Sequence, residues 1–138
     1  MRIFLDTNVL VSAFATRGLA EDILPEVITF HQFVSSKKVL AELEHVLKKK
    51  FAVTEQICTE IQDFLLSNVI LAEDSDRLKL PLSDEADINI VSEAVTANVD
   101  VFVTGDTEVA ELKQVQGMRI LSPREFWELL QTETVEIP

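Results

Sequence analysis

Residues 1–13, MRIFLDTNVLVSA, contain an apolar run that ends abruptly at an acidic side chain. Residues 2–5 lack the polar alternation of a half-exposed strand, which is typical of a strand covered on both faces. Asp6 ends this run, and residues 7–13 after it have the composition of a short helix. A buried strand that leads directly into a helix indicates a parallel sheet built from βαβ units.

The same alternation of apolar runs and helical segments continues along the rest of the chain. Strands that alternate with helices throughout favour the α/β class, with helices covering a parallel sheet. Further strands are predicted over residues 33–35, 68–71, 101–104 and 119–121, and further helices over residues 19–30, 39–50, 54–67, 83–98 and 109–112.

Local patterns also predict where helices begin and which faces they bury. Ser83 is a suitable N-cap for the helix before the fourth strand. Ser122, Pro123 and Glu125 form a capping box with proline at the first helical position, so a last helix is expected there. The periodicity of the helix over residues 54–67 predicts an inner face made of Ile57, Ile61, Phe64 and Leu65.

Length and composition restrict the class of protein. The chain has 138 residues, of which 47% are hydrophobic and 26% charged, the balance of a packed globule and not of a disordered chain. Three glycines and four prolines are too few for the many tight turns of an all-β barrel or sandwich. We therefore expect one α/β domain that spans residues 1–138.

The formal net charge of -12 is the opposite of the basic footprint of a typical nucleic-acid-binding protein. A role on nucleic acid would therefore need a local source of positive charge. The single cysteine, Cys58, permits no internal disulfide, and no run of eighteen apolar residues occurs. These features predict a soluble, cytoplasmic protein without a membrane segment.

Two aspartates occupy the carboxyl ends of predicted strands, the edge of a parallel sheet where ligands bind. These are Asp6 and Asp106, and each could instead be only a helix cap, because loops that enter helices often end in a capping residue. Asp87 is more informative, since it lies near the middle of an apolar helical stripe, where an unpaired carboxylate is costly. Its place in the first helical turn directs it toward the same sheet edge.

Glu42 is a fourth acid, one turn into a helix that leaves a strand. By itself it could equally be a residue of a solvated helix face. Several carboxylates that converge at one edge repel each other, and a hard cation such as Mg²⁺ or Mn²⁺ relieves that repulsion. A site of this kind would support metal-assisted hydrolysis of a phosphodiester.

Five segments together resemble the successive motifs of the PIN-domain ribonucleases, most closely those of the prokaryotic toxin-like group that includes the VapC toxins. The resemblance covers essentially the whole chain. It implies a five-stranded parallel sheet in the order 3-2-1-4-5 with helices on both faces. The segments are LDTNVLVSA (residues 5–13), VLAELEHVL (39–47), DINIVSEA (87–94), VFVTGD (101–106) and ILSPREF (120–126).

The resemblance also assigns roles to individual residues. It implies that Asp6, Glu42, Asp87 and Asp106 are catalytic, that the three aspartates among them hold Mg²⁺ or Mn²⁺, and that Asn8 and Thr104 support the metal. Many relatives have an aspartate two positions after the last acid, where this chain has Glu108. Candidate auxiliary acids are Asp84 and Glu108.

The implied activity is endonucleolytic cleavage of single-stranded RNA by the toxin of a toxin–antitoxin pair. A small antitoxin protein and a second copy of the chain are the implied partners. The alternative is a catalytically weak PIN fold that acts as a binding or oligomerisation module. Lys48, Lys49 and Lys50 could contact RNA phosphates, or could simply be a solvated helix end that complements the helix dipole.

Overall fold

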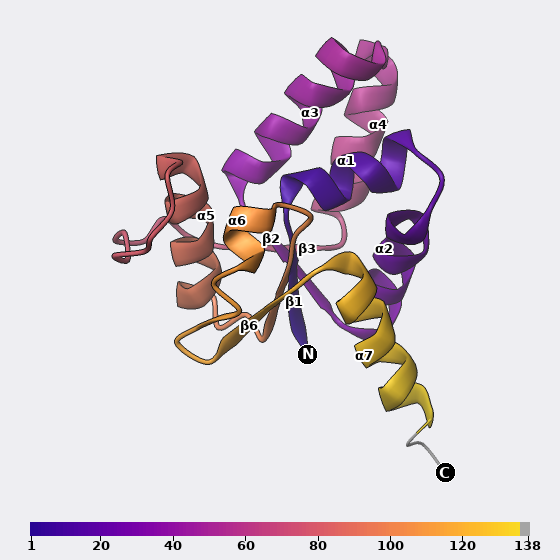
Figure 1. Ribbon diagram of the computed structural model, residues 1–138. Coiled ribbons are helices and arrows are strands. Elements are labelled where there is room, and N and C mark those ends of the chain that lie inside the picture. The colour runs from indigo at the N-terminus through magenta and orange to yellow at the C-terminus, as the bar shows by residue number, and fades with distance from the viewer. Residues whose placement is uncertain (136–138) are drawn as a thin grey trace.

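The computed structural model describes residues 1–135, which form a mixed sheet with helices packed around it (Figure 1). None of the helices in this part of the chain is long and apolar enough to cross a membrane. The strands are β1 (Arg2–Leu5), β2 (Gln32–Ser35), β3 (Val69–Leu71), β4 (Val101–Val103), β5 (Gln114–Val115) and β6 (Met118–Leu121). The helices are α1 (Thr7–Ala15), α2 (Leu19–Phe30), α3 (Lys37–Phe51), α4 (Glu55–Leu66), α5 (Glu85–Thr96), α6 (Thr107–Ala110) and α7 (Pro123–Val135).

The sheet has the order β3-β2-β1-β4-β6-β5, and its first five strands run parallel to their neighbours. The predicted five-strand order is therefore confirmed, with one strand added at the edge. β5 is antiparallel to β6 and contains only two residues. A tight turn joins the two strands, because Gln116 and Gly117 both have positive φ values of 48° and 88°. A two-residue strand is too short to give a period-2 signal in the sequence.

Apolar side chains from both faces of the sheet form one continuous core. Phe4 of β1 and Phe102 of β4 are fully covered, and their rings stack with centroids 5.1 Å apart. The two central strands are thereby held together by side chains as well as by the backbone. On the sides of the sheet, α1 packs against α2 and α3, and α2 packs against α7. Figure 1 shows α5 on the opposite side of the strands from α2 and α7.

The helix ends agree with the predicted caps at one site and differ at another. At the start of α7 the Ser122 amide donates to Glu125 Oε1 at 2.9 Å, and the Glu125 amide donates to Ser122 Oγ at 3.1 Å, which confirms the capping box. The predicted cap at Ser83 is wrong by one residue. Asp84 caps α5 by accepting from the Ala86 amide, whereas the Ser83 hydroxyl donates to Glu108. Both residue types cap helices well, so the sequence alone could not choose between them.

The inner face predicted for α4 is only half correct. Leu65 and Cys58 are buried, as an inner face requires, and Ile61 is partly buried. Ile57 and Phe64, however, are 45% and 47% exposed. The helix packs along α3 at the periphery of the domain, so its buried stripe is narrower than its apolar stripe.

Candidate active site

The central strand pair places two predicted site residues at the same edge of the sheet. Leu5 of β1 pairs with Val103 of β4, and the Asp6 amide donates to the Val103 carbonyl at 2.9 Å. The residues that immediately follow these strands, Asp6 and Thr104, therefore emerge next to each other. This is the topological switch point of an α/β sheet, where the connections from neighbouring strands leave in opposite directions.

The buried carboxylate of Asp6 is held by three donors. Its Oδ1 accepts from the Thr7 amide at 2.8 Å, and its Oδ2 accepts from Thr104 Oγ1 at 2.8 Å and from Asn8 Nδ2 at 3.3 Å. The side chain is buried, with 5% of the residue exposed. These hydrogen bonds offset much of the cost of removing a carboxylate from water.

Asn8 and Thr104 also connect Asp6 to the loop that carries Asp106. The Gly105 amide donates to Asn8 Oδ1 at 2.8 Å, and the Asp106 amide donates to Thr104 Oγ1 at 3.0 Å. A Cβ atom at Gly105 would lie 3.2 Å from Asn8 Oδ1, so this close approach favours glycine. Asn8 and Thr104, which the sequence predicts to support the metal, therefore contact Asp6, and Thr104 also contacts the backbone of Asp106.

Three of the acids are helix caps as well as pocket residues. Asp6, Asp84 and Asp106 accept backbone amides at the starts of α1, α5 and α6 through Oδ1. The prediction that Asp6 and Asp106 could be helix caps is therefore confirmed by their hydrogen bonds. It does not compete with a site, because Asp106 and Asp84 use only one carboxylate oxygen each for capping.

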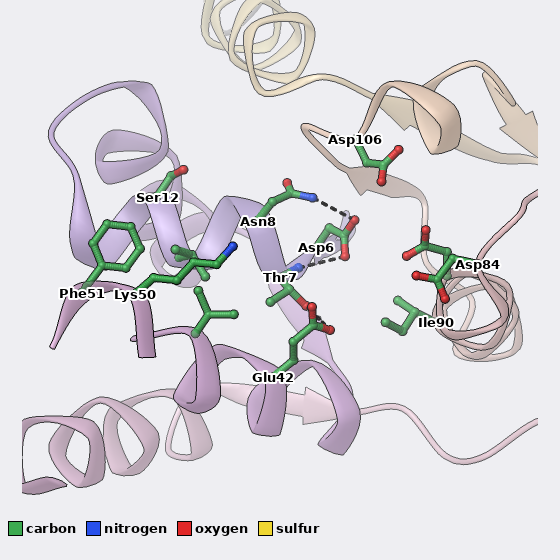
Figure 2. A pocket seen from close by; sticks show the side chains of 13 residues that line it. Asp6, Thr7, Asn8, Ser12, Glu42, Lys50, Phe51, Asp84, Ile90 and Asp106 are labelled. Atoms are coloured by element: carbon green, nitrogen blue, oxygen red, sulfur yellow. Dashed lines mark hydrogen bonds between the residues drawn. The ribbon is translucent and has the colours of Figure 1, made fainter. Parts of the chain in front are cut away.

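A pocket of about 460 Å³ brings all four predicted catalytic acids together (Figure 2). Glu42 enters it from α3 and accepts from Thr7 Oγ1 at 3.5 Å. The candidate auxiliary Asp84 also lines the pocket, whereas Glu108 does not and instead binds Ser83. The lining residues are Asp6, Thr7, Asn8, Val11, Ser12, Glu42, Val46, Lys50, Phe51, Asp84, Asp87, Ile90 and Asp106.

Burial and mutual repulsion raise the pKa of two acids in this pocket. Burial, followed by repulsion from Asp6, Asp84, Asp106 and Glu42, raises the pKa of Asp87 from its ordinary value of 3.8 to about 6. Burial likewise raises the pKa of Asp6, although its hydrogen bonds to Thr104 and Thr7 act in the opposite direction. Strongly perturbed acids in a cleft are typical of functional sites.

The donor set suits a hard divalent cation, which prefers carboxylate oxygens. A bound cation would also reverse the mutual repulsion that raises the pKa of Asp87. Among the side chains that the structure describes, those of residues 1–132, no group of three or more His, Cys, Asp or Glu is arranged as it stands to hold a metal ion. The pocket therefore supplies the donor groups that a cation prefers without a finished coordination arrangement.

The three lysines of the predicted RNA strip have different surroundings. Lys48 is paired with Glu55 at 2.7 Å and with Glu44 at 3.4 Å, and Lys49 is exposed outside the pocket. Lys50 lines the pocket, together with Phe51. At 3.6 residues per turn Lys49 lies closer to Glu42 around α3 than Lys50 does, so helical spacing in the sequence could not have singled out Lys50.

Comparisons with known proteins agree with the fold. The sequence profile of the PIN domain family matches residues 2–108. The structure is similar to a chain in the crystal structure of VapBC2 from Rickettsia felis bound to a DNA fragment from their promoter, with a TM-score of 0.62 and 19% identity. That similarity covers 88% of this chain and 98% of the other. No curated protein matches the sequence.

An α/β sheet with carboxylates gathered at its switch point defines the class of protein. The chain belongs to the PIN domain family, as the match over most of its length shows. PIN domains are generally nucleases, and they generally use divalent metals. At 19% identity, the similarity to the VapBC2 chain supports the fold alone.

The raised pKa of Asp87 predicts a pH-dependent cost to folding in a chelating buffer. Its pKa is 3.8 as ordinary carboxyl and about 6 in the folded chain, so ionisation destabilises the native state as pH rises through this window. The Asp87→Asn variant cannot ionise there. We expect it to melt at a higher temperature than the wild type at about pH 7, and at the same temperature below about pH 4.

Thermal melts followed by circular dichroism across this range measure the difference. Asp76→Asn, in the exposed loop before α5, is the matched control for removing an acidic side chain outside the pocket. An Asp87→Asn difference that is constant from low to neutral pH would show that the pocket does not perturb this carboxyl.

Proposed function

We propose that the chain is a divalent-metal-dependent ribonuclease that cleaves single-stranded RNA endonucleolytically, with residues 1–138 as one nuclease domain. The observation that carries this proposal is the convergence of five acidic side chains in one pocket at the switch point of the sheet. Membership of the PIN domain family supports a nuclease, and the resemblance to VapC toxins supports RNA as the substrate. Cleavage would proceed by attack of water on phosphorus.

In this proposal Asp6, Asp87 and Asp106 hold Mg²⁺ or Mn²⁺, and Glu42 acts as a further ligand or through a water. When bound, the cation would act as a Lewis acid toward the phosphodiester and would favour deprotonation of the attacking water. The chain's own residues fix the acids. Thr104 and Asn8 hold the orientation of Asp6 through the hydrogen bonds to its Oδ2. Such supporting contacts are commonly worth about 10- to 100-fold in metal affinity or activity.

The net charge of -12 is compatible with an RNA substrate on this account. Because the composition is acidic, it predicts no extended basic surface. The bound cation would instead provide the positive potential at the phosphate that reacts. Low non-specific affinity for nucleic acid would follow from the same charge. Low non-specific affinity is compatible with an enzyme that releases its product, and it is unsuitable for a protein that coats nucleic acid.

We further propose that the chain is the toxin of a toxin–antitoxin pair, with a small antitoxin and a second copy of the chain as partners. The structural likeness to a chain of VapBC2 supports this, together with the motif resemblance. An acidic pocket open to solvent is complementary to an inserted Arg or Lys side chain. A partner of that kind would compete with the cation for the same carboxylates.

Divalent cations should stabilise the folded chain. Because a ligand that binds only the native state adds stability by mass action, Mg²⁺ or Mn²⁺ at 100 times its Kd should add about 2.7 kcal/mol to the free energy of unfolding. Asp6→Asn should abolish this response, since it removes a carboxylate from the site. Urea unfolding of both proteins with the cation or with a chelator measures the response.

Asp76→Asn, outside the pocket, should respond to cations as the wild type does. A wild type that is indifferent to both cations would contradict the proposal of an active nuclease. It would leave a PIN fold that serves as a binding or oligomerisation module as the better account.

Cleavage of single-stranded RNA should distinguish Asp87 from its neighbour Asp84. Asp87→Asn should lower kcat/KM by more than about 100-fold, beyond the usual cost of losing a supporting residue. Asp84→Asn keeps a good N-cap, because Asn and Asp cap helices about equally, so activity and stability should change little. The assay compares both variants with the wild type in Mg²⁺, Mn²⁺ or chelator. Equal losses in the two variants would show that Asp84 belongs to the catalytic set.

A further inference from the structure

We propose that Lys50 and Phe51 form a nucleotide-binding subsite beside the acids, in which Phe51 stacks on an unpaired base and Lys50 contacts an adjacent phosphate. This inference rests on the proposed ribonuclease function, because it takes single-stranded RNA as the ligand of the pocket. It specifies how a strand would lie across the pocket and which residue would select unpaired nucleotides.

The subsite is continuous with the acidic part of the pocket. Glu42, Val46 and Lys50 all line it and recur every four residues, so they lie along one face of α3. The eight-residue separation of Glu42 and Lys50 is a rise of about 12 Å along the helix. Figure 2 shows Lys50 and Phe51 at one end of the pocket, with Asp84 and Asp106 at the other. A strand that enters one end would reach the other within a few nucleotides.

Phe51 is an exposed aromatic ring on a fixed backbone. It is the last residue of α3, and the residue is 43% exposed although it is apolar. The next residue, Ala52, is in the left-handed conformation with φ 52°, and the amides of Ala52 and Val53 both donate to the Leu47 carbonyl. Val53 then packs against the core. The helix end is therefore anchored on both sides of Phe51, while the ring faces the pocket.

Lys50 supplies the positive charge that a phosphate requires. It is the one basic side chain among the described residues that line the pocket, and no ion pair joins it to another described residue. Lys48, by contrast, is held between Glu44 and Glu55. The strip of three lysines considered from the sequence is thereby reduced to one residue that faces the site.

The combination of an aromatic ring and a cation favours a nucleotide over an apolar peptide as the occupant. Bases stack on aromatic side chains irrespective of sequence, and each stacked base is worth about 1–3 kcal/mol by alanine substitution. An apolar peptide would gain nothing from Lys50. A base within a duplex has both faces covered by its neighbours, so the subsite would discriminate against paired strands.

The test measures binding of a labelled single-stranded RNA by fluorescence anisotropy in Mg²⁺, with every variant in the Asp87→Asn background so that the RNA stays intact. Phe51→Ala should weaken binding about 5- to 150-fold, which is the stacking energy expressed as a ratio of Kd values. Phe51→Trp should retain tight binding. Lys50→Gln should lower the slope of log Kd against log salt by about 0.7, the value for one phosphate contact on a single strand.

Two matched controls separate this subsite from general effects of exposed residues. Phe64→Ala removes a ring that is 47% exposed on α4, outside the pocket, and Lys49→Gln removes the neighbouring exposed charge. Both should leave the Kd and the salt slope unchanged. Thermal melts of all variants show whether the fold is retained.

A scan of single abasic sites along the RNA identifies the stacked base. An abasic site at one position of the RNA should weaken its binding to the protein that has Phe51, and the same abasic site should not affect binding to the Phe51→Ala variant.

Tight RNA binding that is unaffected by Phe51→Ala and Lys50→Gln would overturn the subsite and leave the proposed function intact. RNA that the Asp87→Asn protein does not bind and that the wild type does not cleave would overturn both the subsite and the proposed function. Loss of binding equal to that of the two controls would also overturn the subsite.

Discussion

The parallel pairing of β1 with β4 is the constraint on which the rest of the site depends. It sets Asp6 next to Thr104 and brings the loop with Asp106 to the same edge. The stacked rings of Phe4 and Phe102 fix this pair of strands from within the core. The helices that leave the edge then add Glu42 and Asp87. The strand pair and these two helices together bring charges from four separate parts of the chain into one pocket.

The pocket is maintained at a cost to stability, because its acids repel each other. Asp6 tolerates burial through three hydrogen bonds, and capping roles at helix starts partly compensate Asp84 and Asp106. For Asp87, burial and then repulsion from the neighbouring acids raise the pKa to about 6. A domain that keeps such a cluster exchanges stability for function, which is common at active sites.

The sequence predicts the parallel core and the acids well, because apolar runs and the acids that end them are local signals. Strands such as residues 2–5 are recognisable without any knowledge of their neighbours. Features that depend on tertiary contacts were not predictable in the same way. The two-residue β5 carries no period, the choice of Asp84 over Ser83 as a cap depends on Glu108, and the exposure of Phe64 depends on how little of α4 is covered.

The acids of the pocket form one electrostatically coupled cluster, and a bound cation would relieve their repulsion. An NMR titration of the Asp87 side-chain carboxyl measures this coupling. We expect a pKa of about 6 in chelator, a lower pKa in the Asp6→Asn variant, and a further fall when Mg²⁺ or Mn²⁺ is added. A carboxyl that titrates at its ordinary value of 3.8, with no change on substitution of Asp6 or addition of either cation, would contradict it.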